Sequence, residues 1–343
     1  MARVLVTGGG GFIGSHLAER LLTLGHDVVI LDNFSTGRRE NIKPFRDRIT
    51  LYEADIRDRE ALLRAMEGVD CVFHEAALPS VPRSVQNPLE SHDVNATGTL
   101  TVLLAARDSG VRRVIYAASS SAYGDTESPV KNEHFSPRPI SPYGASKLAG
   151  EYYCQVFNTV YSLEAVCLRY FNVFGPRQNP DSPYTGVMAI FIPAMLRGER
   201  PRIFGDGSAT RDYTYIDNNV DANILAMTAQ GVSGEVINTA CGGRVSVLEV
   251  VEILNRILGT SIQPEFCDPR PGDILHSCAD TSKARRLLKL EPRISVEEGL
   301  RRTVEWYRQE LAIGRLSLGG RASWRATSGS DKSARREPRP PLK

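Results

Sequence analysis

Short apolar runs alternate with amphipathic stretches along the first half of the chain. Each run has the length of one buried strand, and the stretches between them repeat apolar residues at the spacing of a helix face. Strands that alternate with helices predict an α/β fold, in which a parallel sheet is covered by helices on both faces. The predicted strands are residues 4–6, 28–31, 49–52, 71–74, 114–117 and 164–168, and the predicted helices include 59–66, 91–109 and 143–160.

A glycine-rich turn follows the first strand and precedes the first helix. Gly8, Gly11 and Gly14 have G-x-x-G-x-x-G spacing, and the second predicted strand ends at Asp32. Such glycines bring backbone N–H groups to a pyrophosphate at a helix N-terminus, and the acid accepts hydrogen bonds from ribose hydroxyls. We therefore predict a Rossmann-type doubly wound sheet that binds NAD, because the carboxylate repels the 2′-phosphate of NADP. Arg38 and Arg39 lie nearby in the sequence, so NADP stays open as the cofactor. The alternative to dinucleotide binding is an unrelated α/β domain with a glycine loop.

Small and polar residues directly follow several predicted strands. In a parallel sheet of this kind, ligands bind beyond the carboxyl ends of the strands. The sequence therefore gathers a candidate site at one edge of the sheet. The residues at these ends are Gly8–Gly14, Asp32, Asp55, Ala76, Ala77 and Ser119–Ser121.

The alternation ends after Leu168, where a Pro- and Gly-rich region begins. The helices predicted beyond this point are separated by loops, which indicates a smaller mixed α/β substrate-binding lobe over the ligand edge. We divide the chain into a dinucleotide-binding domain at 1–172, to which later segments return, a lobe at 173–312 and a basic tail at 313–343. The tail has little to bury, so we expect it to be disordered. Contact with anionic surfaces is its alternative role.

Composition limits the kind of protein. Of the 343 residues, 41% are hydrophobic and 24% are charged, with a net charge of +2, so nothing demands a nucleic-acid or membrane partner. The six cysteines contain no Cys-x-x-Cys pattern, which favours reduced thiols in a cytoplasmic protein over a disulfide framework or a metal site. A secretory signal and an apolar run of about 18 residues are both absent, so we expect neither secretion nor a membrane span.

Tyr143 and Lys147 are four residues apart, so a helix places them on the same face. An ammonium near the phenol favours the phenolate, which lowers a pKa that is about 10 in water. The pair can then abstract a proton from a sugar or alcohol hydroxyl. Taken alone, the spacing equally fits an ordinary helix surface, so the other motifs decide.

Several motifs recur in a fixed order between residues 2 and 311. They resemble those of the extended short-chain dehydrogenase/reductase family, specifically its NAD-dependent nucleotide-sugar epimerases and dehydratases. The motifs are Thr7-Gly8-x-x-Gly11-Phe12-Ile13-Gly14, Asp55-Ile56-Arg57-Asp58, Asn95-x-x-Gly98-Thr99, Ser119-Ser120-Ser121-x-Tyr123-Gly124, Ser141-Pro142-Tyr143-x-x-x-Lys147, Leu168-Arg169-Tyr170-Phe171-Asn172-Val173-Phe174-Gly175, Gly205-Asp206-Gly207, Arg211-Asp212 and Arg270-Pro271-Gly272-Asp273.

Three features resemble the UDP-hexose 4-epimerases, and among them the bacterial UDP-N-acetylglucosamine 4-epimerases. The family's dehydratases follow the catalytic Thr with Asp-Glu and its decarboxylases keep a Glu there, whereas this chain has Ser120-Ser121. Residues 77–84 are similar to the loop of the N-acetylhexosamine epimerases. A bulky Tyr four residues after the Asp of the R-x-G-D motif confines the family's sugar pocket. Ser277 at that position implies room for an acetamido group, with an exposed loop serine as the alternative.

The resemblance implies a role for each matched residue. Tyr143 would take the proton of the C4 hydroxyl, Ser119 would hydrogen-bond the C4 oxygen, and Lys147 would hold the cofactor ribose. Arg211 and Arg270 would pair with the substrate pyrophosphate. The implied cofactor-binding residues are Gly8, Gly11, Phe12, Ile13, Gly14, Asp32, Asn33, Asp55, Ile56, Ala76, Ala77, Asn95, Tyr143, Lys147 and Tyr170. The implied substrate-binding residues are Ser80, Ser119, Ser120, Ser121, Tyr143, Asn172, Arg211, Arg270, Asp273 and Ser277.

Two further residues and an interface follow from the same resemblance. Tyr123 is expected near the nicotinamide or the sugar, and His74, which ends a predicted strand, is expected to be structural. Relatives pair the helices that correspond to 96–109 and 145–160. These helices carry apolar residues on more than one face in this chain, so we expect a homodimer.

We therefore predict an NAD-dependent 4-epimerase that interconverts UDP-GlcNAc and UDP-GalNAc through a 4-keto intermediate, with UDP-glucose and UDP-galactose as a second pair. One alternative is another nucleotide-sugar enzyme of the same fold, such as a UDP-glucuronate epimerase or decarboxylase or a dTDP-glucose 4,6-dehydratase. The other is a non-enzymatic NAD-binding protein, against which the intact set of Ser119, Tyr143 and Lys147 argues.

Overall fold

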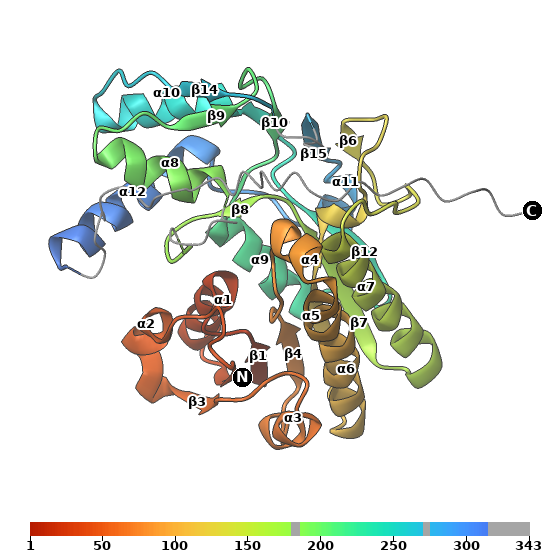
Figure 1. Ribbon diagram of the computed structural model, residues 1–343. Coiled ribbons are helices and arrows are strands. Elements are labelled where there is room, and N and C mark those ends of the chain that lie inside the picture. Colours follow the sequence, from red (N-terminus) through yellow and green to blue (C-terminus); the bar gives the residue numbers. More distant parts are fainter. Residues whose placement is uncertain (180–185, 270–274, 315–343) are drawn as a thin grey trace, which may run out of the picture.

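A computed structural model describes residues 1–179, 186–269 and 275–314 of the chain. At its centre, seven parallel strands lie in the order β12-β7-β5-β4-β1-β2-β3 (Figure 1). The order runs in opposite directions from β1, so the switch point, where doubly wound sheets bind ligands, lies between β1 and β4. The strands are β1 (Arg3–Thr7), β2 (Asp27–Leu31), β3 (Ile49–Tyr52), β4 (Cys71–His74), β5 (Arg113–Ser119), β7 (Glu164–Tyr170) and β12 (Val236–Thr239).

Both faces of this sheet are buried, which explains the nearly continuous apolar runs in the sequence. Val4 and Val6 belong to the apolar cluster on one face, and Leu5 between them belongs to the cluster on the other. The helices that cover the first face include α1 (Phe12–Thr23) and α9 (Ile216–Thr228). The second face is covered by α3 (Arg59–Ala65), α6 (Gly98–Asp108) and α7 (Pro142–Tyr161).

The single helix predicted over 91–109 is interrupted in the structure. Helix α5 (Pro88–His92) passes through a π-helical turn at Asp93–Thr97, named η2, before α6 begins at Gly98. Such π-turns occur frequently at functional sites because they redirect side chains that a regular helix would hold elsewhere. Periodicity alone does not reveal this turn, since the apolar spacing continues through it.

A smaller lobe of mixed sheets lies at one end of the parallel sheet (Figure 1). Its four-stranded sheet has the order β13-β10-β15-β6 and contains both parallel and antiparallel pairs, and two parallel pairs, β8 with β11 and β9 with β14, accompany it. The predicted doubly wound α/β fold with a smaller mixed lobe is therefore confirmed. The strands are β6 (Val130–Lys131), β8 (Val173–Phe174), β9 (Arg202–Phe204), β10 (Thr210–Arg211), β11 (Thr214–Tyr215), β13 (Val245–Ser246), β14 (Glu265–Cys267) and β15 (His276–Ala279).

Helices α8, α10 and α12 pack against one another in this lobe, and Figure 1 shows α8 and α10 beside β9 and β14, far from β3 and α3. Among the described residues, no helix is both long and apolar enough to cross a membrane. The remaining helices are α2 (Arg39–Ile42), η1 (Lys43–Arg48), α4 (Val81–Gln86), η3 (Ser120–Ala122), α8 (Val187–Leu196), α10 (Val247–Leu258), α11 (Ser282–Leu288) and α12 (Val296–Ala312).

Candidate active site

The turn after β1 requires glycine at two positions, because a Cβ at Gly8 or Gly14 would clash with the neighbouring backbone. Gly8 has a φ of +71°, a left-handed conformation that favours glycine. A Cβ on Gly8 would stand 2.7 Å from the backbone nitrogen of Ala76, and a Cβ on Gly14 would stand 2.2 Å from the carbonyl oxygen of Gly8. Helix α1 begins at Phe12 and Ile13 with Gly11 as its uncapped N-cap. Its N-terminal N–H groups are therefore available to an anion, as a dinucleotide pyrophosphate requires.

Asp32 follows β2 and stabilises this turn through hydrogen bonds. Its carboxylate accepts hydrogen bonds from the backbone N–H of Gly10 at 2.8 Å and from that of Phe34 at 2.7 Å. Burial raises the pKa of Asp32, and these two bonds act against the rise. One acid therefore shapes the turn and lines the cleft beside it.

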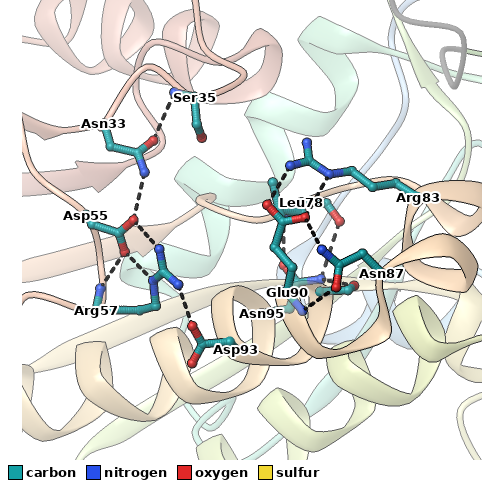
Figure 2. Close-up of polar contacts among 11 residues, drawn as sticks. Asn33, Ser35, Asp55, Arg57, Leu78, Arg83, Asn87, Glu90, Asp93 and Asn95 are labelled. Carbon is teal, nitrogen blue, oxygen red and sulfur yellow. Dashed lines mark hydrogen bonds and ion pairs between the residues drawn. The ribbon is translucent and has the colours of Figure 1, made fainter.

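The neighbouring wall of the cleft is held by a chain of polar contacts (Figure 2). The Asn33 amide donates to Asp55 at 2.8 Å, and the guanidinium of Arg57 binds Asp55 at 2.9 Å and also pairs with Asp93. Arg57 lowers the pKa of Asp55 to about 2, so this carboxylate stays ionised. The predicted cofactor residues that line the cleft are Gly8, Asp32, Asn33, Asp55, Ile56, Ala76 and Ala77.

Asn95 has a different position from the other predicted cofactor residues. It lies in the π-turn, is 1% exposed, and accepts a hydrogen bond from the N–H of Leu78 at 2.8 Å (Figure 2). Its amide nitrogen donates to the hydroxyl of Ser146 at 3.1 Å. The Asn95 side chain therefore fixes the loop after β4 to α7, and its expected role in cofactor binding stays a prediction.

Ser119 ends β5, and Tyr143 and Lys147 lie one turn apart near the start of α7. Burial raises the pKa of the Tyr143 phenol above its ordinary value, and the neighbouring hydroxyl of Ser119 acts against that rise. Lys147 is buried, donates from Nζ to the carbonyl of Ala117 at 2.7 Å, and has its pKa lowered by burial to about 8. Lys147 was expected to lower the phenol pKa, and the group that acts in this direction is Ser119.

Glu75 is a residue of this site that the sequence interpretation missed. It directly follows β4, lines the cleft, and accepts a 2.7 Å hydrogen bond from the hydroxyl of Tyr170. Burial raises the pKa of Glu75 to about 7, against the opposing effects of Tyr170 and Lys147. An acidic residue immediately after the strand Cys71–His74, at the edge of the sheet where ligands bind, was the signal that could have revealed it.

His74 and Tyr123 are both held by buried hydrogen bonds. The imidazole of His74 is fully buried between the hydroxyls of Thr7 at 2.8 Å and Thr99 at 2.9 Å, and burial lowers its pKa to about 3. Tyr123 is fully buried as well, with its hydroxyl donating to Asn238 at 2.7 Å, and its expected place near the nicotinamide or the sugar stays a prediction.

The predicted substrate residues come partly from the smaller lobe and partly from segments that follow strands of the parallel sheet. Arg211 on β10 and Ser277 on β15 are direct partners in the strand register, and Ser277 is 7% exposed. Asn172, just after β7, donates from its amide to the carbonyl of Asp212 at 3.3 Å, which joins the two lobes. Ser80 caps α4, and Ser120 and Ser121 form η3 directly after Ser119. Arg270 and Asp273 lie outside the described residues, as does the tail from residue 315.

The described ranges contain no cluster of His, Cys, Asp or Glu side chains that could hold a metal ion. The cysteines in this part of the chain are all free thiols.

Comparison with known proteins agrees with this geometry. The model of the NAD dependent epimerase/dehydratase family matches residues 4–240. A UDP-glucose 4-epimerase of Mycolicibacterium smegmatis is 40% identical over 90% of this chain and 99% of its own. The crystal structure of a Thermotoga maritima UDP-glucose 4-epimerase with UDP-glucose is 40% identical, covering 90% of this chain and 99% of that one, with a TM-score of 0.86.

A second solved structure widens the range of sugars among the relatives. The UDP-N-acetylglucosamine 4-epimerase of Methanobrevibacter ruminantium, in complex with UDP-N-acetylmuramic acid, is 39% identical. The match covers 90% of this chain and 99% of that one, with a TM-score of 0.86. With a family match over most of the described sheet and relatives aligned along nearly their whole length, this chain belongs to the NAD dependent epimerase/dehydratase family.

Proposed function

We propose that this chain is an NAD-dependent 4-epimerase of UDP-hexoses. The observation that carries the proposal is that the hydroxyl of Ser119 lies near enough to the Tyr143 phenol to lower its pKa, and that Lys147 bonds the Ala117 carbonyl, at the sheet edge that also holds the glycine turn. A phenol beside a hydroxyl, with a buried ammonium one helical turn along α7, is a general acid and base suited to a sugar hydroxyl.

Gly8, Gly11 and Gly14 in the turn would hold NAD, which would supply a hydride acceptor for C4 of the sugar. In this proposal Tyr143 removes the proton of the C4 hydroxyl and later gives it back to the 4-keto sugar, and Ser119 hydrogen-bonds the C4 oxygen and relays the proton. Lys147 would hold the cofactor ribose, and the positive charge of an oxidised nicotinamide would favour the phenolate that burial disfavours.

Arg211 and Asn172 are proposed to hold the substrate pyrophosphate while the sugar turns. A guanidinium suits phosphate oxygens because its N–H groups form a planar fork. The Arg211 side chain already lies in this part of the lobe, where it donates to the carbonyls of Thr210 at 2.9 Å and Leu275 at 3.1 Å. We extend the same role to Arg270, and assign Asp273 to the uridine ribose, from the sequence motif alone.

For the sugar, we propose UDP-GlcNAc and UDP-GalNAc, with UDP-glucose and UDP-galactose as a second pair. Ser277 is a small side chain on the strand beside Arg211, which supports space for an acetamido group. Ser120 and Ser121 stand where an elimination reaction would need an acid and a base. This favours epimerisation over dehydration.

A substrate panel tests this assignment. Purified protein with NAD is incubated separately with UDP-GlcNAc, UDP-glucose and UDP-glucuronate, and the product sugars are resolved. Formation of the galacto epimers of the first two supports the proposal, while exclusive turnover of UDP-glucuronate, or release of water or carbon dioxide, would replace it. Tyr143→Phe should bind NAD as the wild type does and lose turnover.

We also propose a homodimer that forms through α7. Apolar side chains on this helix are exposed in the single chain, among them Tyr152 at 52%, Val156 at 49% and Val160 at 63%. Monomeric proteins rarely leave such a stripe open. Val156→Lys should shift the sedimentation coefficient from dimer to monomer, whereas Ile190→Lys, at a similarly exposed apolar residue on α8, should leave it unchanged.

A further inference from the structure

We propose that Ser84 is a positioning residue for Tyr143. Through Ser84, a change in the conformation of the loop after β4 alters the position of the first turn of α7. Ser84 is fully buried in α4, and its Oγ accepts a 3.0 Å hydrogen bond from the backbone N–H of Tyr143. This inference rests on the proposed function, because it takes Tyr143 as the acid and base.

The Ser84 hydroxyl acts as the acceptor in its hydrogen bond with the backbone N–H of Tyr143. Its one hydrogen is donated to the carbonyl of Val81 at 2.7 Å, so only its lone pairs remain for the N–H of Tyr143. That N–H belongs to the first turn of α7, where backbone donors have no partner within their own helix. A long-range side chain therefore satisfies a donor that would otherwise be left unpaired next to the candidate active site.

A second attachment lies one turn further along α7. Asn95 holds both the N–H and the carbonyl of Leu78, at 2.8 and 3.3 Å, and donates to the hydroxyl of Ser146, which in turn donates to the carbonyl of Tyr143. The loop and α4, residues 78–86, are thus fixed to the backbone of Tyr143 from both sides. Ser80 in the same segment is a proposed sugar contact. Binding of the sugar would therefore change the position of the Tyr143 phenol through this segment.

Ser141 offers a matched control for Ser84. Its hydroxyl also accepts an N–H of the first turn of α7, that of Gly144 at 3.1 Å, but it lies on the helix's own chain and has no link to residues 78–86. Ser141→Ala removes a cap and loosens the helix end. Ser84→Ala removes the link to the loop, so the two variants separate helix fraying from transmission.

The first measurement is steady-state kinetics with a UDP-sugar. We expect Ser84→Ala to lower kcat between about tenfold and a hundredfold, the loss typical of a small misplacement of a reacting group, with NAD content unchanged. Ser141→Ala should keep kcat within about twofold of the wild type at the same or greater loss of Tm. Ser84→Thr, which restores a hydroxyl, should recover part of the kcat. Equal kcat losses in Ser84→Ala and Ser141→Ala would overturn the proposal.

The second measurement does not depend on turnover. Amide hydrogen exchange is followed in peptides covering 78–86 and 141–147, with and without UDP-GlcNAc as the UDP-sugar. In the wild type, UDP-sugar should protect both peptides, and in Ser84→Ala only the first. In the free protein, the Tyr143 amide should exchange faster in Ser84→Ala than in Ser141→Ala, and an unchanged rate would disprove the link. If the UDP-sugar protects neither peptide of the wild type while the free-protein result holds, the proposed substrate fails and the link stands.

Discussion

The hydroxyl of Tyr170 donates a 2.7 Å hydrogen bond to the carboxylate of Glu75, which joins the carboxyl ends of β7 and β4 across β5. The same hydroxyl also bonds the amide of Asn223 on α9. Lys147 and Glu75 stabilise each other's charged forms. An acid that is half-protonated near neutral pH therefore lies beside the ammonium of the candidate active site.

Replacement of Glu75 by Gln should move the alkaline limit of activity to lower pH. Burial lowers the pKa of Lys147 to about 8, and Glu75 is the strongest of the groups that raise it. Without the carboxylate this pKa falls further, so the ammonium is lost at a lower pH. The measurement is the pH profile of kcat/KM, with Glu297→Gln, at an exposed ion pair with Arg256, as the control. If kcat/KM falls at the same alkaline pH in both variants, Glu75 does not raise the pKa of Lys147.

Replacement of Gly14 by Ala should weaken NAD binding by more than about tenfold. The new Cβ would stand 2.2 Å from the carbonyl oxygen of Gly8, so the turn would have to move away from the cleft. Gly243→Ala is the control, because a Cβ there meets nothing within 4 Å and the residue does not have a positive φ. Titration of NAD against the protein, followed calorimetrically, measures both. Equal affinities in the two variants would refute the role of this close contact.

Replacement of Asp212 by Asn should lower the free energy of unfolding by about 2–4 kcal/mol. The buried carboxylate accepts backbone N–H bonds from Cys241 at 3.0 Å, Gly242 at 2.9 Å and Ala279 at 3.2 Å, and an amide supplies only one oxygen for them. Urea unfolding measures the loss. Asp206→Asn, at an exposed carboxylate that bonds nearby Ser208, should change stability little.

Asp212 also predicts a pH dependence of stability. Burial raises its pKa from 3.8 to about 6 in the folded chain. A pKa raised by folding gives stability that is full below the unfolded value and is lost as the pH rises through the folded value. The stability difference between the wild type and Asp212→Asn should therefore shrink as the pH rises from about 4 to about 7. A difference that grows over this range would contradict the sign of the shift.

Replacement of Ser277 by Tyr should reduce turnover of UDP-GlcNAc relative to UDP-glucose by about tenfold or more. Ser277 is nearly buried beside Arg211, so a large ring there takes the space proposed for the acetamido group. The ratio of the two kcat/KM values is the measurement. Ser261→Tyr, at an exposed serine, should leave the ratio unchanged. A ratio that does not move in Ser277→Tyr would remove this residue from the sugar pocket.

The sequence alone determined the framework of this protein. A short, continuously apolar run such as Val4-Leu5-Val6, followed at once by a glycine turn, predicts a strand buried on both faces. The structure agrees, since the alternate residues belong to two opposite apolar clusters. The spacing of Gly8, Gly11 and Gly14 depends only on local backbone geometry, so the dinucleotide turn was readable without the fold. Tyr143 and Lys147 share a helix face for the same local reason.

Only the tertiary structure decided which side chains meet. Glu75 and Tyr170 lie 95 residues apart in sequence, and their contact depends on the order of strands in the sheet. The sequence motif that contains Asn95 does not reveal that a π-turn directs its amide to Leu78 and Ser146. Nor does the motif that contains Tyr123 reveal that packing buries this residue fully. Local spacing fixes where a backbone turns, whereas the destination of a polar side chain depends on partners that only the folded chain brings within reach.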